Sequence, residues 1–340
     1  MSDAKITADN HYVPQGYLKQ WATNGGVWTY RLLVQHPNVP QWVQKSPVSL
    51  GSQRHLYTEV EEGNDLDELE RWFNQSFETP SAESIRKVVE DDRLTPEDWD
   101  ALVRFLAAQD LRTPKTYFEM TARWSKTLPA LIENTLADSL QKVTELTKAG
   151  IVLPPPAPVV DKKTPFRVKA DREAGKIESA VLNGRRFWLR QIKDRLETTA
   201  KVLHQHRWTI LAPPKGLYWP TSDSPVINLR AGGKGYRLER AWGLSKMNIM
   251  MPLSPRHLLF TQVGDRPPRR GSVLDLGLAS LVRRVTAENA FRFIFTQSPD
   301  DEMSALRPRR ESAEDFKAEQ KVWADWHKTH SDAEKAFDEV

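Results

Sequence analysis

The chain has 340 residues, a formal net charge of +4 at pH 7, twelve tryptophans and no cysteine. Its length allows one large core or two modest ones, and the lack of cysteine excludes disulfides, thiolate catalysis and cysteine-ligated zinc. No uncharged apolar run reaches the roughly 20 residues that span a bilayer, and the opening MSDAKITADN lacks the apolar core of a signal peptide. We therefore expect a folded cytoplasmic protein with no membrane segment.

The first predicted element is a helix that starts at Pro14, within the stretch NHYVPQGYLKQWA (residues 10–22). Val13 precedes a proline and is biased toward extended backbone, whereas proline suits the first helical position. His11 therefore comes just before a helix N-terminus, where free backbone N–H groups favour an anion. A histidine there could bind a phosphate or carboxylate, or act as an acid or base. The structural alternative is that His11 and Tyr12 only pack or cap locally.

The next elements are two short strands and two helices. NGGVWTYRLLV predicts a tight turn into a strand, and HLYTEV (residues 55–60) predicts a second strand. Helical spacing of apolar residues predicts a helix over residues 65–78. TPED (residues 95–98) is typical of a helix start, with a threonine cap and a proline in the first turn. The pair at residues 113–114, Thr-Pro, should end this helix.

In the second half, LPPPAPVV (residues 153–160) is expected to be an extended linker inside a single domain of residues 1–310. Residues 172–204 then read as a basic helix or helix pair, and strand-like segments cluster over residues 208–296. Because helices and strands are segregated, we predict an α+β fold. A helical half would pack on a mostly antiparallel sheet, in which N-terminal strands join C-terminal strands. Residues 311–340 are expected to form a charged C-terminal helix.

Charge is distributed unevenly along the chain. Residues 59–110 contain 16 acidic and 5 basic side chains, whereas residues 161–240 contain 18 basic and 8 acidic ones. The two blocks could pair with each other, which is the outcome that we favour. Alternatively, residues 162–195 could form an exposed basic face for a polyanion such as nucleic acid.

Polar residues interrupt apolar stripes in the two predicted helices of the first half. Glu70 falls on the inward face of its helix, where a carboxylate needs a partner. In the following helix Gln109 continues the apolar stripe, and Arg112 lies about one turn further on. We expect Arg112 to form a bidentate pair with Glu70, with a purely structural ion pair as the alternative. Asp223, in PTSDSPV, is placed at a strand end, where aspartate is also a common turn former.

Five segments are characteristic when they are taken together: NHYVPQGYLKQWA, LYTEV, LAAQDLRTP, PTSDSPV and MPLSPRHLLF, in this order over roughly residues 10–296. As an ordered set they resemble the bacterial family named domain of unknown function 4238 (DUF4238). Gly16 stands where an aromatic residue is expected, and Ser224 where asparagine is expected. The resemblance implies membership of that family and no particular activity. It points to four of the polar positions already reached: His11, Gln109, Arg112 and Asp223.

The leading functional hypothesis is a phosphoester or phosphodiester hydrolase that acts on nucleic acid or nucleotides. Its site would contain His11, Glu70 and Asp223 as catalytic residues, and Tyr12, Gln109 and Arg112 as substrate-binding residues. We expect these residues to converge on one cleft, with Glu70 or Asp223 bonded to Arg112. The carboxylates and the histidine could also hold a divalent metal. The alternative is a non-enzymatic module that binds nucleic acid or a protein, and a scaffold with mutually neutralised charge blocks is a third reading.

Overall fold

The structure, a computed structural model, describes residues 8–61, 64–66, 68–151, 165–171, 176–233 and 235–339. Contacts between residues group the chain into two compact units. The larger unit comprises Met1–Thr116 and Ile192–His327, and the smaller one Tyr117–Gln191 and Lys328–Val340. The expected linker at residues 153–160 lies outside the described residues, and the single domain over residues 1–310 stays a prediction. The α+β fold class is confirmed.

The larger unit begins with β1 (Asp9–His11), which pairs antiparallel with β5 (Ser52–Arg54). Helix α1 (Gln15–Leu18) starts one residue later than predicted, because Pro14 is its N-cap with extended backbone (ψ 141°), and it continues as a 3-10 turn, η1 (Lys19–Trp21). Between β1 and α1 the backbone N–H groups of Tyr12 and Val13 both donate to the carbonyl oxygen of Gly51, at 2.8 and 3.0 Å. Gly51 has φ +62°, and a Cβ there would meet Val13 at 2.8 Å. Glycine is therefore required where these two segments touch.

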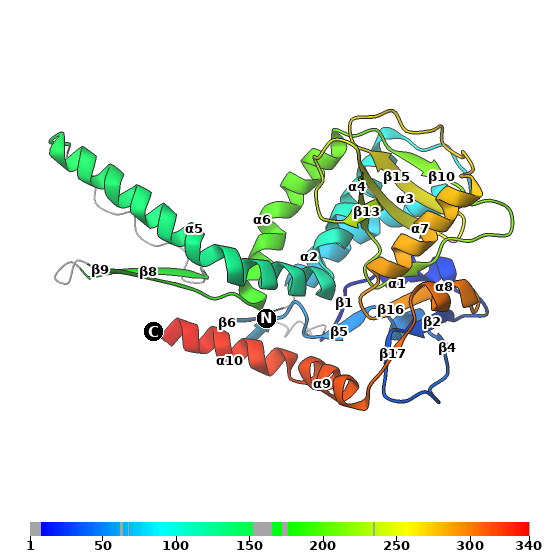
Figure 1. The fold of residues 1–340 in the computed structure, drawn as a ribbon, viewed down its shortest axis with the longest axis horizontal. Coiled ribbons are helices and arrows are strands. Elements are labelled where there is room, and N and C mark those ends of the chain that lie inside the picture. The colour runs from blue at the N-terminus through cyan, green and yellow to red at the C-terminus, as the bar shows by residue number, and fades with distance from the viewer. Residues whose placement is uncertain are drawn as a thin grey trace, which may run out of the picture. The chain divides into compact units, whose positions relative to one another are not determined.

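The N-terminal strands join C-terminal ones, as predicted, although in several separate sheets. A four-stranded antiparallel sheet has the order β11 (Thr221–Ser222), β16 (Phe293–Thr296), β2 (Val27–Arg31) and β4 (Trp42–Lys45). A five-stranded antiparallel sheet has the order β10 (Thr209–Leu211), β15 (His257–Gln262), β14 (Met247–Ser254), β12 (Ile227–Gly232) and β13 (Gly235–Leu238). Helix α7 (Leu276–Asn289) packs on the latter sheet through Ala279, Val282 and Val285 (Figure 1).

Four short strands, one 3-10 turn and two helices complete the description of the larger unit outside its helical part. They are β3 (Leu33–Val34) with its parallel partner β17 (Arg310–Glu311), the hairpin β6 (Glu59–Glu61) and β7 (Asn64–Leu66), the 3-10 turn η2 (Pro47–Ser49), and helices α8 (Asp301–Leu306) and α9 (Ala313–Ala324). The strand expected over residues 55–60 begins only at Glu59. His55 has φ +54°, which a strand does not accommodate, and Tyr57 is buried instead of alternating on a pleated strand.

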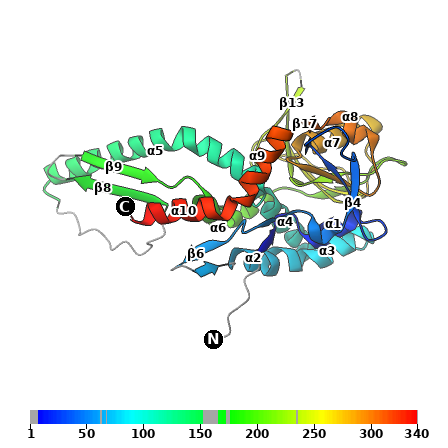
Figure 2. The ribbon, with the colours of Figure 1, turned by 90° about the horizontal axis from the view of Figure 1, so that it is seen from below.

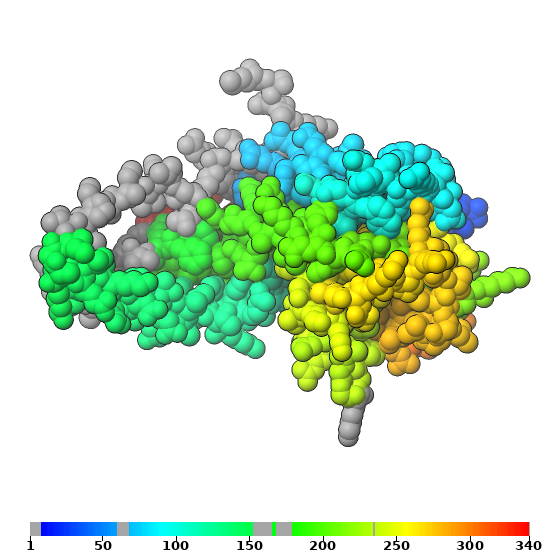
Figure 3. Space-filling view, turned by 90° about the horizontal axis from the view of Figure 1, so that it is seen from above, coloured from blue at the N-terminus to red at the C-terminus, as the bar shows by residue number. Residues whose placement is uncertain are grey.

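The helical part of the larger unit runs from Glu68 to Leu111. Its members are α2 (Glu68–Phe73), a π-helical segment η3 (Asn74–Glu78), α3 (Thr79–Val89) and α4 (Pro96–Leu111). The Thr95 cap is confirmed as a capping box with Asp98, and α4 ends before Thr113 as predicted. Figure 3 shows the cyan helices beside the yellow and orange C-terminal segments of this unit.

Helix α4 is tied to the segment after β13 by a buried carboxylate that the sequence did not single out. Asp110 accepts hydrogen bonds from the Trp242 indole (3.0 Å) and the Asn228 amide (3.4 Å). The Arg240 guanidinium donates to its carbonyl oxygen at 2.9 Å. A helical half thus packs on the C-terminal strands of the same unit, as expected.

The smaller unit contains most of the long helix α5 (Pro114–Lys148), the hairpin β8 (Phe166–Asp171) and β9 (Lys176–Val181), the first turns of α6 (Arg185–His204), and most of α10 (Trp326–Glu339). In this unit the hairpin lies between α5 and α10 (Figures 1 and 2). The helix expected over residues 172–204 is wrong in its first part, because residues 176–181 pair with β8 as a strand. The expected C-terminal helix is two helices, since α9 ends at Ala324, capped by Asp325.

The basic residues of α6 are largely paired. Buried Arg185 contacts Glu334 at 2.8 Å, and Arg186 contacts Asp338 at 2.6 Å. The acidic partners of these two therefore lie in α10 and not, as expected, in residues 59–110. Lys193 follows the expectation with Glu59, at 3.5 Å. None of the helices that the structure describes is long and apolar enough to cross a membrane.

The capping box of α4 generates a pH-dependent prediction. Burial alone would raise the pKa of the Asp98 carboxyl. Hydrogen bonds from Thr95, Lys87 and Ser84 have a larger, opposite effect and lower this pKa to about 2. A folded-state pKa below the unfolded value of about 3.9 stabilises the fold above pH 4, and this contribution is lost between about pH 4 and 2. Asp98→Asn should reduce the free energy of unfolding by about 1–2 kcal/mol at pH 7.

Denaturant unfolding of both proteins between pH 7 and 3 measures this difference, which should shrink as the pH falls below 4. Asp100→Asn, on the same helix with 56% of its side chain exposed, is the control and should change stability little. A difference that stays constant down to pH 3 would show that the Asp98 charge contributes nothing.

Candidate functional site

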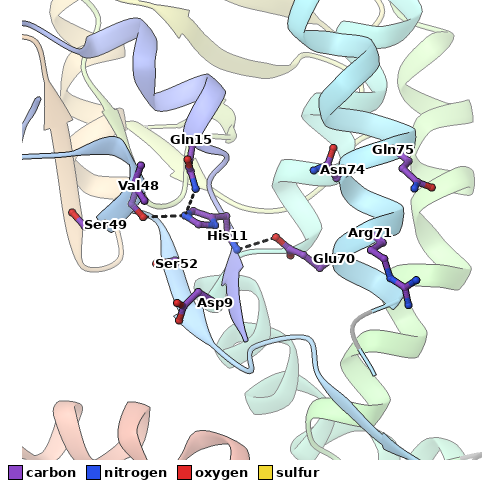
Figure 4. Close-up of a pocket in the computed structure, with 10 residues that line it drawn as sticks. All are labelled: Asp9, His11, Gln15, Val48, Ser49, Ser52, Glu70, Arg71, Asn74 and Gln75. Atoms are coloured by element: carbon purple, nitrogen blue, oxygen red, sulfur yellow. Dashed lines mark hydrogen bonds between the residues drawn. The ribbon is translucent and has the colours of Figure 1, made fainter. Parts of the chain in front are cut away.

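A cavity of about 760 Å³ lies between β1, the η2–β5 segment and the α2–η3 helix in the larger unit. Ten residues line it: Asp9, His11, Gln15, Val48, Ser49, Ser52, Glu70, Arg71, Asn74 and Gln75. Figure 4 shows His11 and Gln15 close together, with Glu70 reaching toward His11 from the helix. All but Val48 are polar or charged, and the volume falls within the roughly 300–1,000 Å³ of small-molecule sites.

His11 is fixed at three points. Its backbone N–H donates to Glu70 Oε1 at 3.1 Å. Its ring Nε2 lies 3.2 Å from the Val48 carbonyl oxygen and 3.1 Å from the Gln15 amide nitrogen. Nε2 donates to the carbonyl only when it carries a proton, and it accepts from the amide only when it does not. The neighbours of the ring therefore offer a partner for either state of this nitrogen.

Behind this cavity lies a buried network centred on Arg112, which is fully buried. Its Nε donates to the Tyr12 carbonyl oxygen at 3.1 Å, and its Nη1 donates to Glu78 Oε1 at 2.8 Å. Gln109 completes the network once its amide oxygen is assigned toward the guanidinium. The oxygen then accepts from Arg112 Nε and Nη2 at 2.7 and 2.8 Å, and the amide nitrogen donates to the Tyr12 carbonyl at 3.2 Å.

One further contact stabilises the Arg112 charge, and another fixes the Arg112 backbone. The guanidinium lies 4.9 Å from the centre of the Phe73 ring, and the Arg112 carbonyl oxygen accepts from the Tyr57 hydroxyl at 2.6 Å. Burial lowers the pKa of Arg112, but the negative charges of Glu78 and Glu70 outweigh this and raise it. Arg112 therefore stays protonated. Truncating its side chain would leave the carbonyl and carboxylate oxygens around it without their hydrogen-bond donor.

Asp223 has a structural role in the segment that directly precedes β16. Its two carboxylate oxygens accept from the backbone N–H groups of Phe291 (2.9 Å) and Arg292 (2.8 Å). Burial raises the pKa of this carboxyl, and the same backbone donors oppose the rise. Tyr12 is also buried, and burial together with the Asp223 charge raises the pKa of its hydroxyl. In this geometry Asp223 holds a turn.

The structure thus brings the six predicted residues into one region of the larger unit but not into one pocket. His11 and Glu70 line the cavity, whereas the other four are buried and do not: Tyr12, Gln109, Arg112 and Asp223. The expectation that Gln109 and Arg112 share the pocket of His11 is therefore wrong. The carboxylate bonded to Arg112 is that of Glu78, where Glu70 or Asp223 was expected. A π-helical segment holds one residue more per turn, so the helix register changes at η3 and the stripe through Glu70 no longer predicts which carboxylate faces Arg112.

Several cavity residues were missed from the sequence. Gln15 is part of the quoted opening stretch and could have been found as the first polar side chain after Pro14, on the helix that His11 precedes. Asn74 and Gln75 open the π-helical segment, a distortion that is frequent at functional sites but leaves no clear sequence signal. Among the described residues, no group of three or more His, Asp or Glu side chains is placed to hold a metal ion. A divalent metal stays a prediction from sequence.

The two layers of this region should respond differently to truncation. Arg112→Ala should lower the free energy of unfolding by about 3–5 kcal/mol, because it removes the partner of Glu78 and of buried oxygens. His11→Ala should lower it by less than about 1 kcal/mol, since the ring is only half-buried and the backbone bond to Glu70 survives. Denaturant unfolding measures both, with exposed Arg71→Ala as the arginine control. Equal destabilisation by the His11 and Arg112 substitutions would place His11 in the structural network.

The comparisons with known proteins agree with the resemblance noted from the sequence. No curated protein and no solved structure matches the chain. A family model described as "Protein of unknown function (DUF4238)" matches residues 9–300, which include the cavity and the buried network behind it. The match covers most of the chain, so this protein belongs to the DUF4238 family.

Proposed function

We propose that the cavity around His11 is the active site of a hydrolase that cleaves a phosphate diester of small-molecule size. The observation that carries this proposal is the setting of the His11 ring. Within the part of the chain that the structure describes, both hydrogen bonds of the ring involve Nε2, so Nδ1 is not used by the protein. Imidazole is the side chain most often used for proton transfer, and here it lines a polar cavity.

The charges that line the cavity support a diester in preference to a monoester. Arg71 is the cation, and Asp9 and Glu70 are the anions. A phosphate monoester carries a charge of about −1.5 to −2 at pH 7, which two carboxylates would repel. A diester carries a single negative charge, which one arginine can balance. Neutral donors for its oxygens are at hand in Gln15, Asn74 and Ser52, whereas the Ser49 hydroxyl already donates to the Ser46 carbonyl oxygen.

In the proposed reaction, His11 removes a proton from a water molecule as the water oxygen attacks phosphorus. A new P–O bond forms, and the P–O bond to the leaving alcohol breaks. The departing oxygen takes up a proton from solvent, and protonated His11 returns its proton to solvent. Glu70 acts as a positioning residue, because its carboxylate accepts the backbone N–H of His11. The buried network fixes the same backbone one residue later, at Tyr12. A catalytic role for Asp223 is not part of this proposal.

The purified full-length chain should hydrolyse at least one member of a panel of diesters. The panel contains bis(p-nitrophenyl) phosphate, cyclic mononucleotides, dinucleoside monophosphates, and single- and double-stranded DNA and RNA, each with and without Mg²⁺ or Mn²⁺. His11→Ala should lower kcat by about 10²–10⁴-fold, as expected for loss of a general acid or base. His11→Gln should lose kcat to a similar degree.

The matched control is His36→Ala, because His36 is exposed and does not line this cavity. Its kcat should equal that of the unsubstituted chain. The proposal fails if no diester is turned over, or if the His11 and His36 variants retain equal activity. Salt-sensitive binding of nucleic acid without turnover would instead support the non-enzymatic alternative.

A further inference from the structure

A second cavity, of about 300 Å³, adjoins the one that contains His11. One wall is apolar and comes from Pro14, Tyr17, Ala82, Ile85 and Phe105. The rest of its lining is mostly polar: Gln20, Asn74, Glu78, Thr79 and Ser81, together with Gly16. This combination differs from the first cavity, in which polar side chains predominate. The two cavities therefore suit different parts of a ligand.

Two features make the cavities neighbours. Asn74, the first residue of η3, lines both of them. At the start of α1 the chain alternates between them, with Gln15 lining the first cavity and Pro14 and Gly16 lining the second. A molecule held at His11 would therefore reach the second cavity by passing Asn74.

The apolar wall is held rigidly. The Tyr17 hydroxyl contacts Thr221 Oγ1 at 2.6 Å and donates to the Pro252 carbonyl oxygen at 2.7 Å. The Tyr17 ring packs against Phe105, with ring centres 5.9 Å apart, and against Trp21 at 5.0 Å. Tyr17 and Phe105 are each only 2% exposed, so they contribute a small area to a wall that is preformed and needs no ordering of side chains when a ligand binds.

The polar edge adds hydrogen-bonding groups of both kinds. The amides of Gln20 and Asn74 each offer a donor and an acceptor, and Glu78 offers a carboxylate that Arg112 holds in place at 2.8 Å. A ring with nitrogen and oxygen atoms on its edge can satisfy these groups, whereas a purely hydrocarbon ring would leave them unpaired. The lining thus favours a heterocycle.

Gly16 leaves this cavity open. It is exposed on α1, and a Cβ built at this position meets no atom within 4 Å. Its φ lies outside the left-handed region, so the backbone does not require glycine. A large side chain at residue 16 can therefore fill the space beside Pro14 and Tyr17 without straining the chain.

From these observations we infer that the second cavity is a subsite for the heterocyclic base of a nucleotide diester whose phosphate lies at His11. This inference rests on the proposed function, which it deepens by naming the class of substrate. The ligand would place its phosphate among the polar groups of the first cavity and its base in the second cavity, beside Gly16 and Ala82, with Asn74 between the two.

The test compares the binding of two diesters to the full-length chain by isothermal titration calorimetry. One is a dinucleoside monophosphate, and the other is the same diester built on two abasic tetrahydrofuran sugars. The dinucleoside should bind at least tenfold more tightly. Gly16→Trp should bring the two Kd values within about twofold of each other, because the indole takes the place of the base, whereas Gly16→Ala should keep the preference.

A second variant guards against misfolding at residue 16. Ala82 is exposed on α3 and lines the same cavity from the other side, so Ala82→Trp should also remove the preference for the base. Equal binding of the two diesters by the unsubstituted chain, or a preference that survives both tryptophan variants, would overturn the subsite. Hydrolysis that depends on His11 would leave the proposed function standing in that case. Conversely, a base preference that both tryptophans abolish, in a chain that hydrolyses no diester, would uphold the subsite and overturn the hydrolase.

Discussion

The buried Arg112 guanidinium is the interaction on which the candidate site depends. It joins the end of α4 to the carbonyl oxygen of Tyr12, which follows His11 directly, and to Glu78 at the end of the π-helical segment. Gln109, one turn earlier on α4, accepts from Nε and Nη2 of the guanidinium through its amide oxygen, and its amide nitrogen donates to the same Tyr12 carbonyl. Three segments distant in sequence are thus fixed to one charged group that solvent does not reach.

This arrangement separates the supporting network from the residue to which we assign the proposed chemistry. The buried network joins Tyr12 to Gln109 and Arg112 at the end of α4. The half-exposed His11 ring, one residue earlier, lines the cavity instead. Sites held by buried hydrogen-bonded groups keep their geometry when a ligand binds, which suits acid–base chemistry because proton transfer needs a fixed distance. Glu78 belongs to both parts, since it pairs with Arg112 and lines the second cavity. The support and the proposed base subsite are therefore physically connected.

Much of this architecture could be predicted from the sequence, because it follows local rules. Pro14 and Thr95 marked two helix starts, the first to within one residue. The segregation of elements predicted the α+β class and the joining of N-terminal with C-terminal strands, of which the pairing of β2 with β16 is an example. The sequence singled out His11 because it precedes a helix N-terminus. It singled out Glu70, Gln109 and Arg112 because polar side chains at buried helix positions need hydrogen-bond partners. Gln109 and Arg112 indeed prove buried, and each has partners.

The remainder depended on tertiary contacts that no local rule encodes. The π-helical segment changes which carboxylate reaches Arg112, so Glu78 replaced the expected Glu70. Residues 176–181 became a strand because β8 pairs with them, despite their position before a basic helix. Asp223 was identified as a polar residue of interest, but its burial against two backbone N–H groups appeared only in the folded chain.

The central claim, that the His11 ring is where a phosphate diester is bound and its reaction assisted, is tested most directly by NMR of the histidine ring nitrogens. The full-length chain with ¹⁵N-labelled histidine would be titrated with bis(p-nitrophenyl) phosphate, and the His11 signals assigned by their loss in His11→Gln. We expect saturable shifts of the His11 ring nitrogens, with Nδ1 affected most, while the exposed His36 signals stay in place. His11 signals that do not move at saturating diester, or that move no more than those of His36, would contradict the claim.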